Sequence, residues 1–178
     1  MVNQVQALQP DHNQQEMEFV PAKPKASTSG DITIHGVGNL LTHMAGCCQP
    51  VPGDPVMGFI THGRGVTVHR ADCEKLLAMQ GDDPNRVIEV TWGEADRITY
   101  PVDVFLRAWD RQGLLKDVIA VLANEKVNVT AVHTQSHQDD NTATMLLTLE
   151  IATLGNLGKV LAKMDQLKGV LEVRRYKK

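Results

Sequence analysis

The sequence of 178 residues predicts an α+β protein, in which a small α/β domain is followed by a ferredoxin-like βαββαβ domain. Three observations support this fold class. Residues 97–178 alternate between strand and helix periodicity, residues 31–92 hold short apolar runs separated by turns, and residues 1–30 are polar. With 42% apolar and 22% charged residues, the composition is that of a globular protein that can bury two small cores.

Residues 1–30 lack the apolar side chains that a packed core needs. The segment contains five glutamines and ends in a run rich in proline, lysine, serine and threonine, so it can bury too little apolar surface to offset the entropy lost on ordering. We predict a disordered linker there. Because this linker follows Met1 directly, we expect the chain to be one piece of a longer protein.

Residues 31–92 are expected to form a small domain of short strands and turns. In order, the pattern predicts a strand at 32–34, helical turns over 40–45, a rigid proline-rich loop over 50–55, a hairpin of 56–61 and 66–68, a short helix over 71–79 and a closing strand over 86–92. A core of this size normally requires a staple such as a bound metal.

Residues 97–178 show a clearer pattern of alternation. Apolar side chains at every second position predict strands over 102–108, 127–133, 143–151 and 170–176, and apolar spacing of three and four residues predicts helices over 114–123 and 157–167. The resulting order is βαββαβ, with both helices on one face of the sheet.

Charge and hydropathy exclude several classes of protein. The net charge of −3 argues against a polycationic nucleic-acid binder, so a basic patch would have to be local. No apolar run reaches the ~18 residues of a membrane helix, and the polar N-terminus resembles no secretion signal, so we expect a cytoplasmic protein with no membrane partner. Since no phosphate-cradling loop and no acidic metal pair is present, we expect no catalytic residues in this segment.

All three cysteines lie in residues 31–92, and two of them are adjacent. An odd number of cysteines in a reducing compartment favours metal binding or reactive thiols over disulfides. Cys47, Cys48, His69 and Cys73 would supply three thiolates and one imidazole, the ligand set of a closed structural zinc site. Two alternatives remain: a buried cysteine pair with an unrelated third, or a thiol nucleophile served by His69 and Asp72.

Two stretches of the sequence resemble the conserved-cysteine domain of the RelA/SpoT family. Residues 35–54 contain the cysteine pair, and residues 58–73 end in His69-Arg-Ala-Asp-Cys73. The sequence is most similar to the RelA-type branch, the ppGpp synthetases of the stringent response. The resemblance implies that the four candidate ligands bind a structural Zn²⁺ ion, so that the first domain is zinc-stapled. Gly46 stands where we expect a basic residue, which affects a possible phosphate contact and not the ligand set.

A further stretch, Asp110-Arg-Gln-Gly-Leu-Leu115, is similar to the signature of ACT domains, with Gln112 at a position that is usually proline. An ACT domain also ends long RelA/SpoT proteins, so the resemblance implies one over residues 97–178. Its loop would bind an amino acid at a dimer interface, where free amides at a helix N-terminus accept a carboxylate. The simpler interpretation is a tight turn with a structural glycine. The loop residues concerned are Asp110, Gly113 and Leu114.

The βαββαβ order is also that of RNA-recognition domains. We expect the open face of the sheet to show Phe105, Arg107, Trp109, Thr130, Val132, Thr144 and Leu146. We place no aromatic side chains on its two central strands, which argues against base stacking and favours contact with RNA phosphates. An ordinary solvated tail is the alternative. The candidate RNA-binding or ribosome-binding residues are Arg64, Arg70, Arg174 and Arg175, with Lys177 and Lys178 beside them.

The two resemblances together imply a regulatory C-terminal part of a GTP pyrophosphokinase. The catalytic domains, which make ppGpp from ATP and GTP, are then expected upstream in the same protein. This part is expected to bind the ribosome, at rRNA of the A-site region with tRNA nearby, and to restrain the synthetase in the free enzyme. The alternative is an amino-acid-sensing ACT module that acts through homodimerisation.

Overall fold

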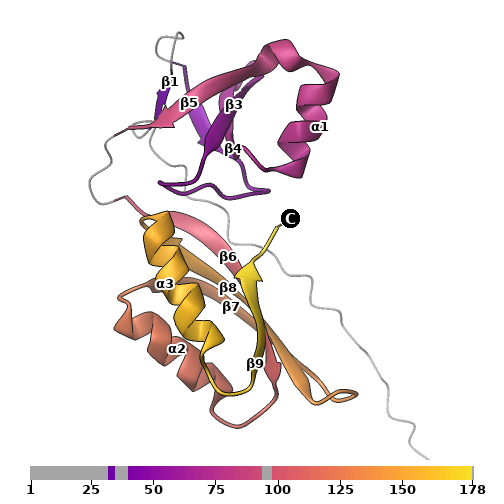
Figure 1. Ribbon diagram of the computed structural model, residues 1–178, viewed down its shortest axis with the longest axis vertical. Helices are drawn as coiled ribbons and strands as arrows, with labels where there is room; N and C mark the ends of the chain where they lie inside the picture. The colour runs from indigo at the N-terminus through magenta and orange to yellow at the C-terminus, as the bar shows by residue number, and fades with distance from the viewer. Residues whose placement is uncertain (1–31, 35–39, 94–97, 178) are drawn as a thin grey trace, which may run out of the picture.

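The structure of the chain is a computed structural model that describes residues 32–34, 40–93 and 98–177, with side chains described from residue 40 onward (Figure 1). Two mixed units follow each other along the chain, a first domain up to residue 93 and a second domain from residue 98. The predicted linker, residues 1–30, lies outside the described residues. Within the described part of the chain, no helix is long and apolar enough to cross a membrane.

The first domain is a five-stranded sheet with one helix packed beside it. Its strands are β1 (Ile32–Ile34), β2 (Thr42–Met44), β3 (Val56–Thr61), β4 (Gly65–Arg70) and β5 (Val87–Trp92), in the spatial order β1-β5-β3-β4-β2. β3 and β4 form the predicted hairpin. Helix α1 (Glu74–Asp82) and the 3₁₀ turn η1 (Pro84–Arg86) connect β4 to β5. The helix begins three residues later than predicted, because Cys73 has an extended backbone and caps it.

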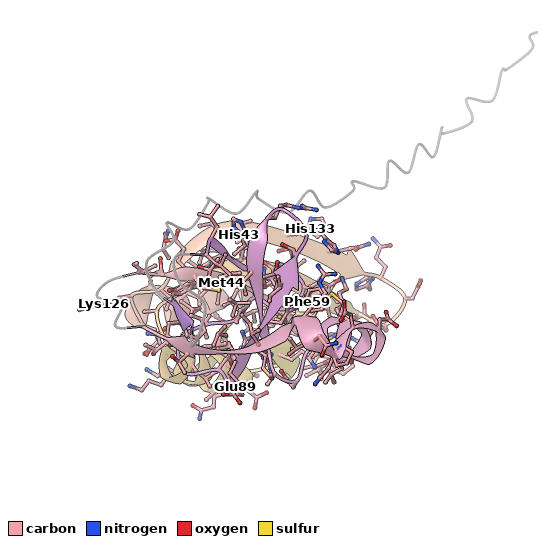
Figure 2. All side chains as sticks on the ribbon, turned by 90° about the horizontal axis from the view of Figure 1, so that it is seen from above. His43, Met44, Phe59, Glu89, Lys126 and His133 are labelled. Atoms are coloured by element: carbon pink, nitrogen blue, oxygen red, sulfur yellow. The ribbon has the colours of Figure 1, made fainter. Side chains whose placement is uncertain are left out.

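Residues 40–45 contain strand β2 and not the helical turns that the sequence predicts. β2 pairs in parallel with β4, and backbone hydrogen bonds of 2.8 Å extend the pairing from the N–H of Val66 to Leu41 and from the N–H of Ala45 to Val68. A segment this short cannot form a stable helix alone, whereas pairing with β4 satisfies its backbone groups. His43 is exposed and Met44 is half-buried on this strand (Figure 2).

The second domain has the predicted ferredoxin-like βαββαβ fold. Its elements are β6 (Tyr100–Trp109), α2 (Leu114–Asn124), β7 (Asn128–His137), β8 (Thr142–Ile151), α3 (Leu154–Asp165) and β9 (Val170–Arg175). The strands form an antiparallel sheet in the order β7-β8-β6-β9, and both helices cover one face of it (Figure 1). The α+β fold class predicted from the sequence is therefore confirmed.

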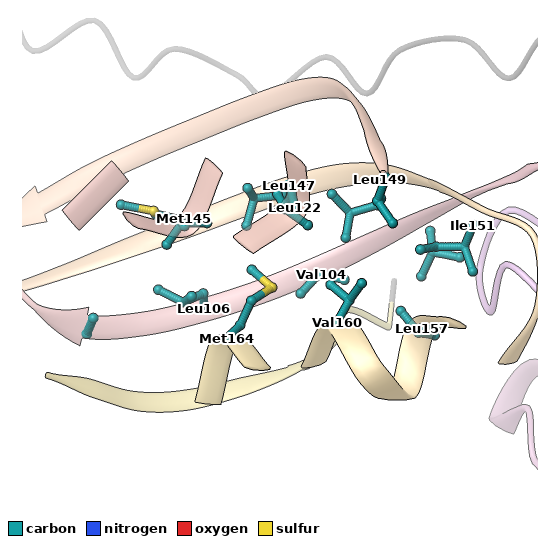
Figure 3. Packing of buried hydrophobic residues seen from close by; sticks show 14 of the residues in the cluster. Val104, Leu106, Leu122, Met145, Leu147, Leu149, Ile151, Leu157, Val160 and Met164 are labelled. Atoms are coloured by element: carbon teal, nitrogen blue, oxygen red, sulfur yellow. The ribbon is translucent and has the colours of Figure 1, made fainter. Parts of the chain in front are cut away.

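Apolar side chains between the sheet and the two helices form the core of the second domain (Figure 3). Its buried members on strands and helices are Tyr100, Val102, Val104, Leu106, Ala108, Ala143, Met145, Leu147, Leu149, Ile151, Leu114, Val118, Leu122, Leu157, Val160 and Met164, and Val127 precedes β7. Each large aliphatic side chain contributes about 1.5–3 kcal/mol when it is fully buried, so this core is the main source of stability. One further buried member, Val51, comes from the first domain.

A β-bulge in β7 changes which side chains lie on the open face of the second sheet. The register of β7 against β8 shifts between Val129 and Ala131. A shift of one residue moves every following side chain to the opposite face. Val132 consequently pairs with Leu147, which faces the helices, and the prediction that Val132 lies on the open face is wrong. His133 lies on the open face in its place.

Strand β6 lies in the centre of the second sheet, between β8 and β9, and carries Phe105 and Trp109. The expectation that the central strands lack aromatic side chains is therefore wrong, because the first strand of this topology is an inner strand. Trp109 is 50% exposed. The guanidinium group of Arg174 lies over the ring of Phe105, with its Cζ atom 4.7 Å from the ring centroid.

Candidate metal centre

The four candidate ligands lie together between β2, β4 and α1 of the first domain. Cys47 and Cys48 follow β2 in a turn, His69 is near the end of β4, and Cys73 directly precedes α1. Their ligand atoms all lie within 4.8 Å of one another. All three cysteines are free thiols, and only Cys47 is partly accessible to solvent. The fold thus unites residues from three separate elements in one cluster.

The distances within the cluster fit a single metal ion. Sγ of Cys47 lies 3.5 Å from Nδ1 of His69 and 3.6 Å from Sγ of Cys73, and Sγ of Cys48 lies 3.8 Å from the same Nδ1. In a tetrahedral site with metal–sulfur bonds of about 2.3 Å and metal–nitrogen bonds of about 2.0 Å, the ligand atoms lie roughly 3.5–3.8 Å apart. The four side chains could therefore hold a metal ion with little rearrangement.

Backbone groups around the cluster fix the position of the cysteine pair. The N–H of Arg70 donates to Sγ of Cys48 at 3.4 Å. The N–H of Gln49 donates to the carbonyl of Ala45 at 2.9 Å, which closes the turn that carries the pair, and Gln49 itself has a φ of +45°. Contacts of this kind orient the ligands of a metal site before the ion binds.

Burial changes the acid–base properties of the cluster. It raises the pKa of Cys48 to about 12, and it raises the pKa of Cys47, which also lies next to the thiol of Cys73. It lowers the pKa of His69, which favours the neutral imidazole that a metal requires. Burial opposes ionisation of Cys73 too, but hydrogen bonds from the N–H of Leu76 and from Cys47 outweigh it, so the pKa of Cys73 is lowered. Cys73 is thus the first of the three thiols to ionise.

The arrangement does not favour a thiol nucleophile. A catalytic His requires a carboxylate that orients its ring. Asp72, the candidate for that role, instead directs Oδ2 toward Nη2 of Arg70 at 2.6 Å, and its side chain is half-exposed. Nδ1 of His69 faces the sulfur atoms of Cys47 and Cys48. The geometry therefore supports metal ligation over thiol catalysis.

The four arginines expected to contact RNA differ in their exposure. Arg64 is exposed in the turn between β3 and β4, and the side chain of Arg174 is 49% exposed. Arg70 is mostly buried and takes part in an ion pair. The side chain of Arg175 is 13% exposed and is directed inward, where it binds Asp54. Two of the four are accessible to a partner, and two are engaged inside the molecule.

Comparison with known protein families identifies both domains. A family model described as the RelA/SpoT RIS domain matches residues 32–93, and one described as the ACT domain matches residues 97–175. The chain belongs to the RelA/SpoT family. Its first domain is a RIS domain and its second domain is an ACT domain.

Several RelA/SpoT relatives are similar along most of this chain. The GTP pyrophosphokinase of Escherichia coli strain K12 is 44% identical over 161 residues, which is 90% of this chain and 22% of that protein. The bifunctional (p)ppGpp synthase/hydrolase RelA of Mycobacterium tuberculosis is 36% identical over 88% of this chain and 21% of its own length. The ACT domain structure from the GTP pyrophosphokinase of Chlorobium tepidum aligns at 17% identity with a TM-score of 0.40, covering 44% of this chain and 99% of that one. The chain spans about a fifth of the length of the curated relatives it matches.

The predicted ligand loop of the ACT domain joins β6 to α2. Asp110 is exposed, Leu114 is buried in the core, and Gly113 directly precedes the helix with a φ of +85°. A Cβ atom at Gly113 would meet nothing within 4 Å, so the left-handed backbone and not a close neighbour accounts for this glycine. Arg111 closes the loop by pairing with Asp117 at 2.6 Å. The turn itself therefore explains the geometry of the loop.

The most buried carboxylate of the RIS domain was not among the residues singled out from sequence. Asp54 is 5% exposed and lies at the end of the run Pro-Val-Pro-Gly-Asp, which the sequence predicts only as a rigid loop. A charged residue that is buried in an apolar run requires a buried partner of opposite charge. The position of Asp54 in this run was therefore the sequence signal that could have indicated such a partner. The partner, Arg175, lies 121 residues further along the chain, so no local pattern connects the two.

Proposed function

We propose that this chain is the regulatory C-terminal part of a GTP pyrophosphokinase of the stringent response, stabilised by a structural zinc ion and binding ribosomal RNA. In the longer protein it would dock near the A site and its tRNA, and would restrain ppGpp synthesis by the catalytic domains upstream when no ribosome is bound. The names of the curated relatives and the pairing of a RIS domain with an ACT domain support this function.

The choice of zinc is supported by the ligand chemistry of the cluster. Three thiolates and one imidazole form a closed site, which leaves no open position for a substrate and is typical of structural zinc. When bound, the ion cross-links the turn after β2 to β4 and α1. The buried apolar cluster around α1 contains only Ala45, Cys48, Phe59, Cys73 and Leu76 among the described residues, and two of these five are ligands. We propose that zinc supplies the cohesion that so small a core lacks.

The open face of the ACT sheet supports the RNA-binding part of the proposal. The central strand β6 presents Phe105, Arg107 and Trp109 on this face, and Arg174 from β9 stacks on the ring of Phe105. His133 lies on the same face from β7. Bases of single-stranded RNA stack on aromatic and guanidinium planes, and their phosphates bind exposed cations. This combination on a central strand is the observation that carries the proposal.

Co-sedimentation with purified 70S ribosomes tests the proposed binding. The double variant Arg64→Ala with Arg174→Ala removes two exposed cations and the stacking partner of Phe105. We expect ribosome affinity to fall by roughly tenfold at physiological salt, and the slope of log affinity against log salt to become shallower by about 1.4, because two phosphate contacts are lost.

Two lysines on the helix-covered side of the ACT domain provide the matched control. Lys116 on α2 and Lys159 on α3 are exposed, so Lys116→Ala with Lys159→Ala removes the same charge from the other side of the sheet. The control variant should bind as the wild type does. Unchanged binding of the arginine variant, or an equal loss in both variants, would contradict recognition through Arg64 of the RIS hairpin and Arg174 of the open ACT face.

Restraint of the synthetase is tested in the full-length protein without ribosomes. Deletion of the RIS and ACT domains should raise the basal rate of ppGpp formation. A basal rate that stays the same or falls would argue against the restraint and leave the ribosome measurement unaffected.

A further inference from the structure

Residues 49–54, here called the docking loop, lie between the cysteine pair and β3 and pack against the ACT domain. Val51 is fully buried and belongs to the ACT core. The carbonyl of Pro52 accepts a hydrogen bond of 2.8 Å from the first N–H of α3, and Oε1 of Gln49 accepts one of 2.7 Å from the N–H of Asp103 on β6. The N–H groups in the first turn of a helix have no partner within the helix, so the docking loop satisfies a group that the ACT domain leaves open.

Asp54 connects the docking loop to an arginine of each domain. Its two carboxylate oxygens each lie 3.0 Å from Nη1 of Arg175, at the end of the last ACT strand, and Oδ2 accepts from the N–H of Val51 at 2.9 Å. Nη2 of Arg175 donates to the carbonyl of Gln49 at 2.6 Å. On the RIS side, Nε of Arg70 lies 3.8 Å from Oδ1 of Asp54. A buried carboxylate therefore lies between two guanidinium groups that belong to different domains.

Both sides of this contact are adjacent to the candidate metal ligands. Cys48 directly precedes the docking loop, and Arg70 directly follows His69. The N–H of Arg70 also donates to Sγ of Cys48. An ion that fixes Cys48 and His69 would therefore fix the starting points of both the docking loop and the Arg70 side chain.

We infer that Asp54 and Arg175 form an interdomain latch, which holds the RIS and ACT domains as one rigid body, and that metal binding at the cysteine cluster sets the position of this latch. The end of β9 points toward the RIS domain, as the latch requires (Figure 1). Loss of Arg175 would leave buried Asp54 with Arg70, at 3.8 Å, as its remaining charged partner, and loss of the Asp54 charge would leave Arg175 without a carboxylate; both changes are unfavourable for groups that are this buried. The second half of the inference rests on the proposed metal site, and the first half does not.

Backbone ¹⁵N relaxation of the whole zinc-loaded chain tests the latch. In the wild type, both domains should tumble with one rotational correlation time. Arg175→Ala and, separately, Asp54→Asn should give the two domains distinct correlation times and lower the melting temperature by something on the order of 10 °C. Arg174→Ala is the matched control, because this neighbouring arginine lies on the open face and contacts Phe105 and Glu172, not the docking loop.

The same spectra separate loss of the latch from loss of folding, because dispersed ACT amide signals report a folded domain. Asp54→Asn keeps the size of the side chain and an acceptor for the N–H of Val51, so it provides the test if Arg175→Ala does not fold. One shared correlation time in Asp54→Asn, or domains that separate equally in Arg174→Ala, would overturn the latch.

Removal of the metal tests the second half of the inference. Treatment of the wild type with EDTA should shift the amide signals of Asp103 and Leu154, which belong to the ACT domain and contact the docking loop. In Arg175→Ala these two signals should no longer respond to EDTA. ACT signals that stay unchanged while RIS signals shift would overturn control of the latch by metal, whereas a wild type that holds no zinc would overturn the proposed metal site and leave the relaxation result valid.

Discussion

The residues of the cysteine cluster combine thiols that hold their protons with one that releases its proton readily. Burial raises the pKa of Cys47 and Cys48, whereas the start of α1 and the neighbouring thiol lower the pKa of Cys73. Within the metal-free cluster, Cys73 is thus the natural first ligand for an incoming ion. The others bind only as the ion displaces their protons.

Zinc binding should therefore release protons near pH 7. Because burial raises the pKa of Cys47 and Cys48, both are protonated in the metal-free protein and each must lose a proton to become a ligand, so we expect at least two protons per ion. Apparent zinc affinity should accordingly rise with pH through the neutral range. Calorimetric titration with ZnCl₂ in two buffers of different ionisation enthalpy measures the release. The variant Cys48→Ala should release one proton fewer, and a release that is equal in both proteins would refute this account of the thiols.

The ligand set itself could be predicted from sequence, but its protonation could not. The adjacent cysteines and the His69-Arg-Ala-Asp-Cys73 run indicate four metal-binding side chains by residue type and spacing. Which thiol ionises first depends on burial and on the N–H groups of a helix whose first residue the sequence places three positions too early. The burial of the thiols and the position of these N–H groups are properties of the packed structure, and the spacing of the cysteines in the sequence does not indicate them.

At the scale of elements, the regular strands and helices of the ACT domain were predictable, and the irregular pairings were not. Alternation identifies β6 and β8 because one face of each is buried. The bulge in β7 reverses that alternation at one residue, and the edge strand β2 has only three residues. The bulge in β7 and the existence of strand β2 both depend on pairing with a neighbouring strand. A prediction made from one segment at a time therefore assigns these two segments wrongly.

Gly65 explains why β2 can lie where it does. Its φ is +79°, and a Cβ atom there would clash with the carbonyl oxygen of Leu41. That oxygen accepts the hydrogen bond from the N–H of Val66 with which the pairing of β2 and β4 begins. Gly63, two residues earlier, has a φ of +74° and open space around it. We expect Gly63→Ala to cost about 1–2 kcal/mol through backbone strain alone, and Gly65→Ala to cost about 1–3 kcal/mol more through the added clash.

Urea unfolding, followed by the amide signals of β3 and β4 in the RIS domain, measures the difference between the two glycine variants. The pair shares its strained backbone, so only the close approach of Leu41 separates them. Equal loss of stability in both variants would mean that β2 does not pack against this hairpin as described.

At the scale of the whole molecule, the sequence predicts two domains but not the contact between them. The pattern of residues 50–55 indicates a rigid loop, and nothing in it shows that Val51 completes the core of the other domain. The polar contacts between the domains join residues that lie between 54 and 127 positions apart. They are fixed by the folded surfaces and leave no periodicity in the chain.

Val51→Ala should consequently destabilise the ACT domain, although the residue belongs to the RIS domain. Truncation of a fully buried aliphatic side chain leaves a cavity, and we expect a loss of about 1–3 kcal/mol. Hydrogen exchange of amides in β6 and α3 measures it, with Val87→Ala, a half-buried position on β5, as the control within the RIS domain. Faster exchange confined to RIS amides in Val51→Ala would show that the docking loop does not contribute to the ACT core.

The metal content of the wild-type chain, purified under reducing conditions and measured by mass spectrometry of the intact protein, tests the central claim most directly. Four ligands, two in the turn after β2, one on β4 and one directly before α1, predict about one zinc ion per chain. In Cys73→Ser both the ion and the folded RIS domain should be lost, while the ACT amide signals remain dispersed. A wild-type RIS domain that is folded and cooperative without any bound metal would contradict the claim that zinc holds this domain together.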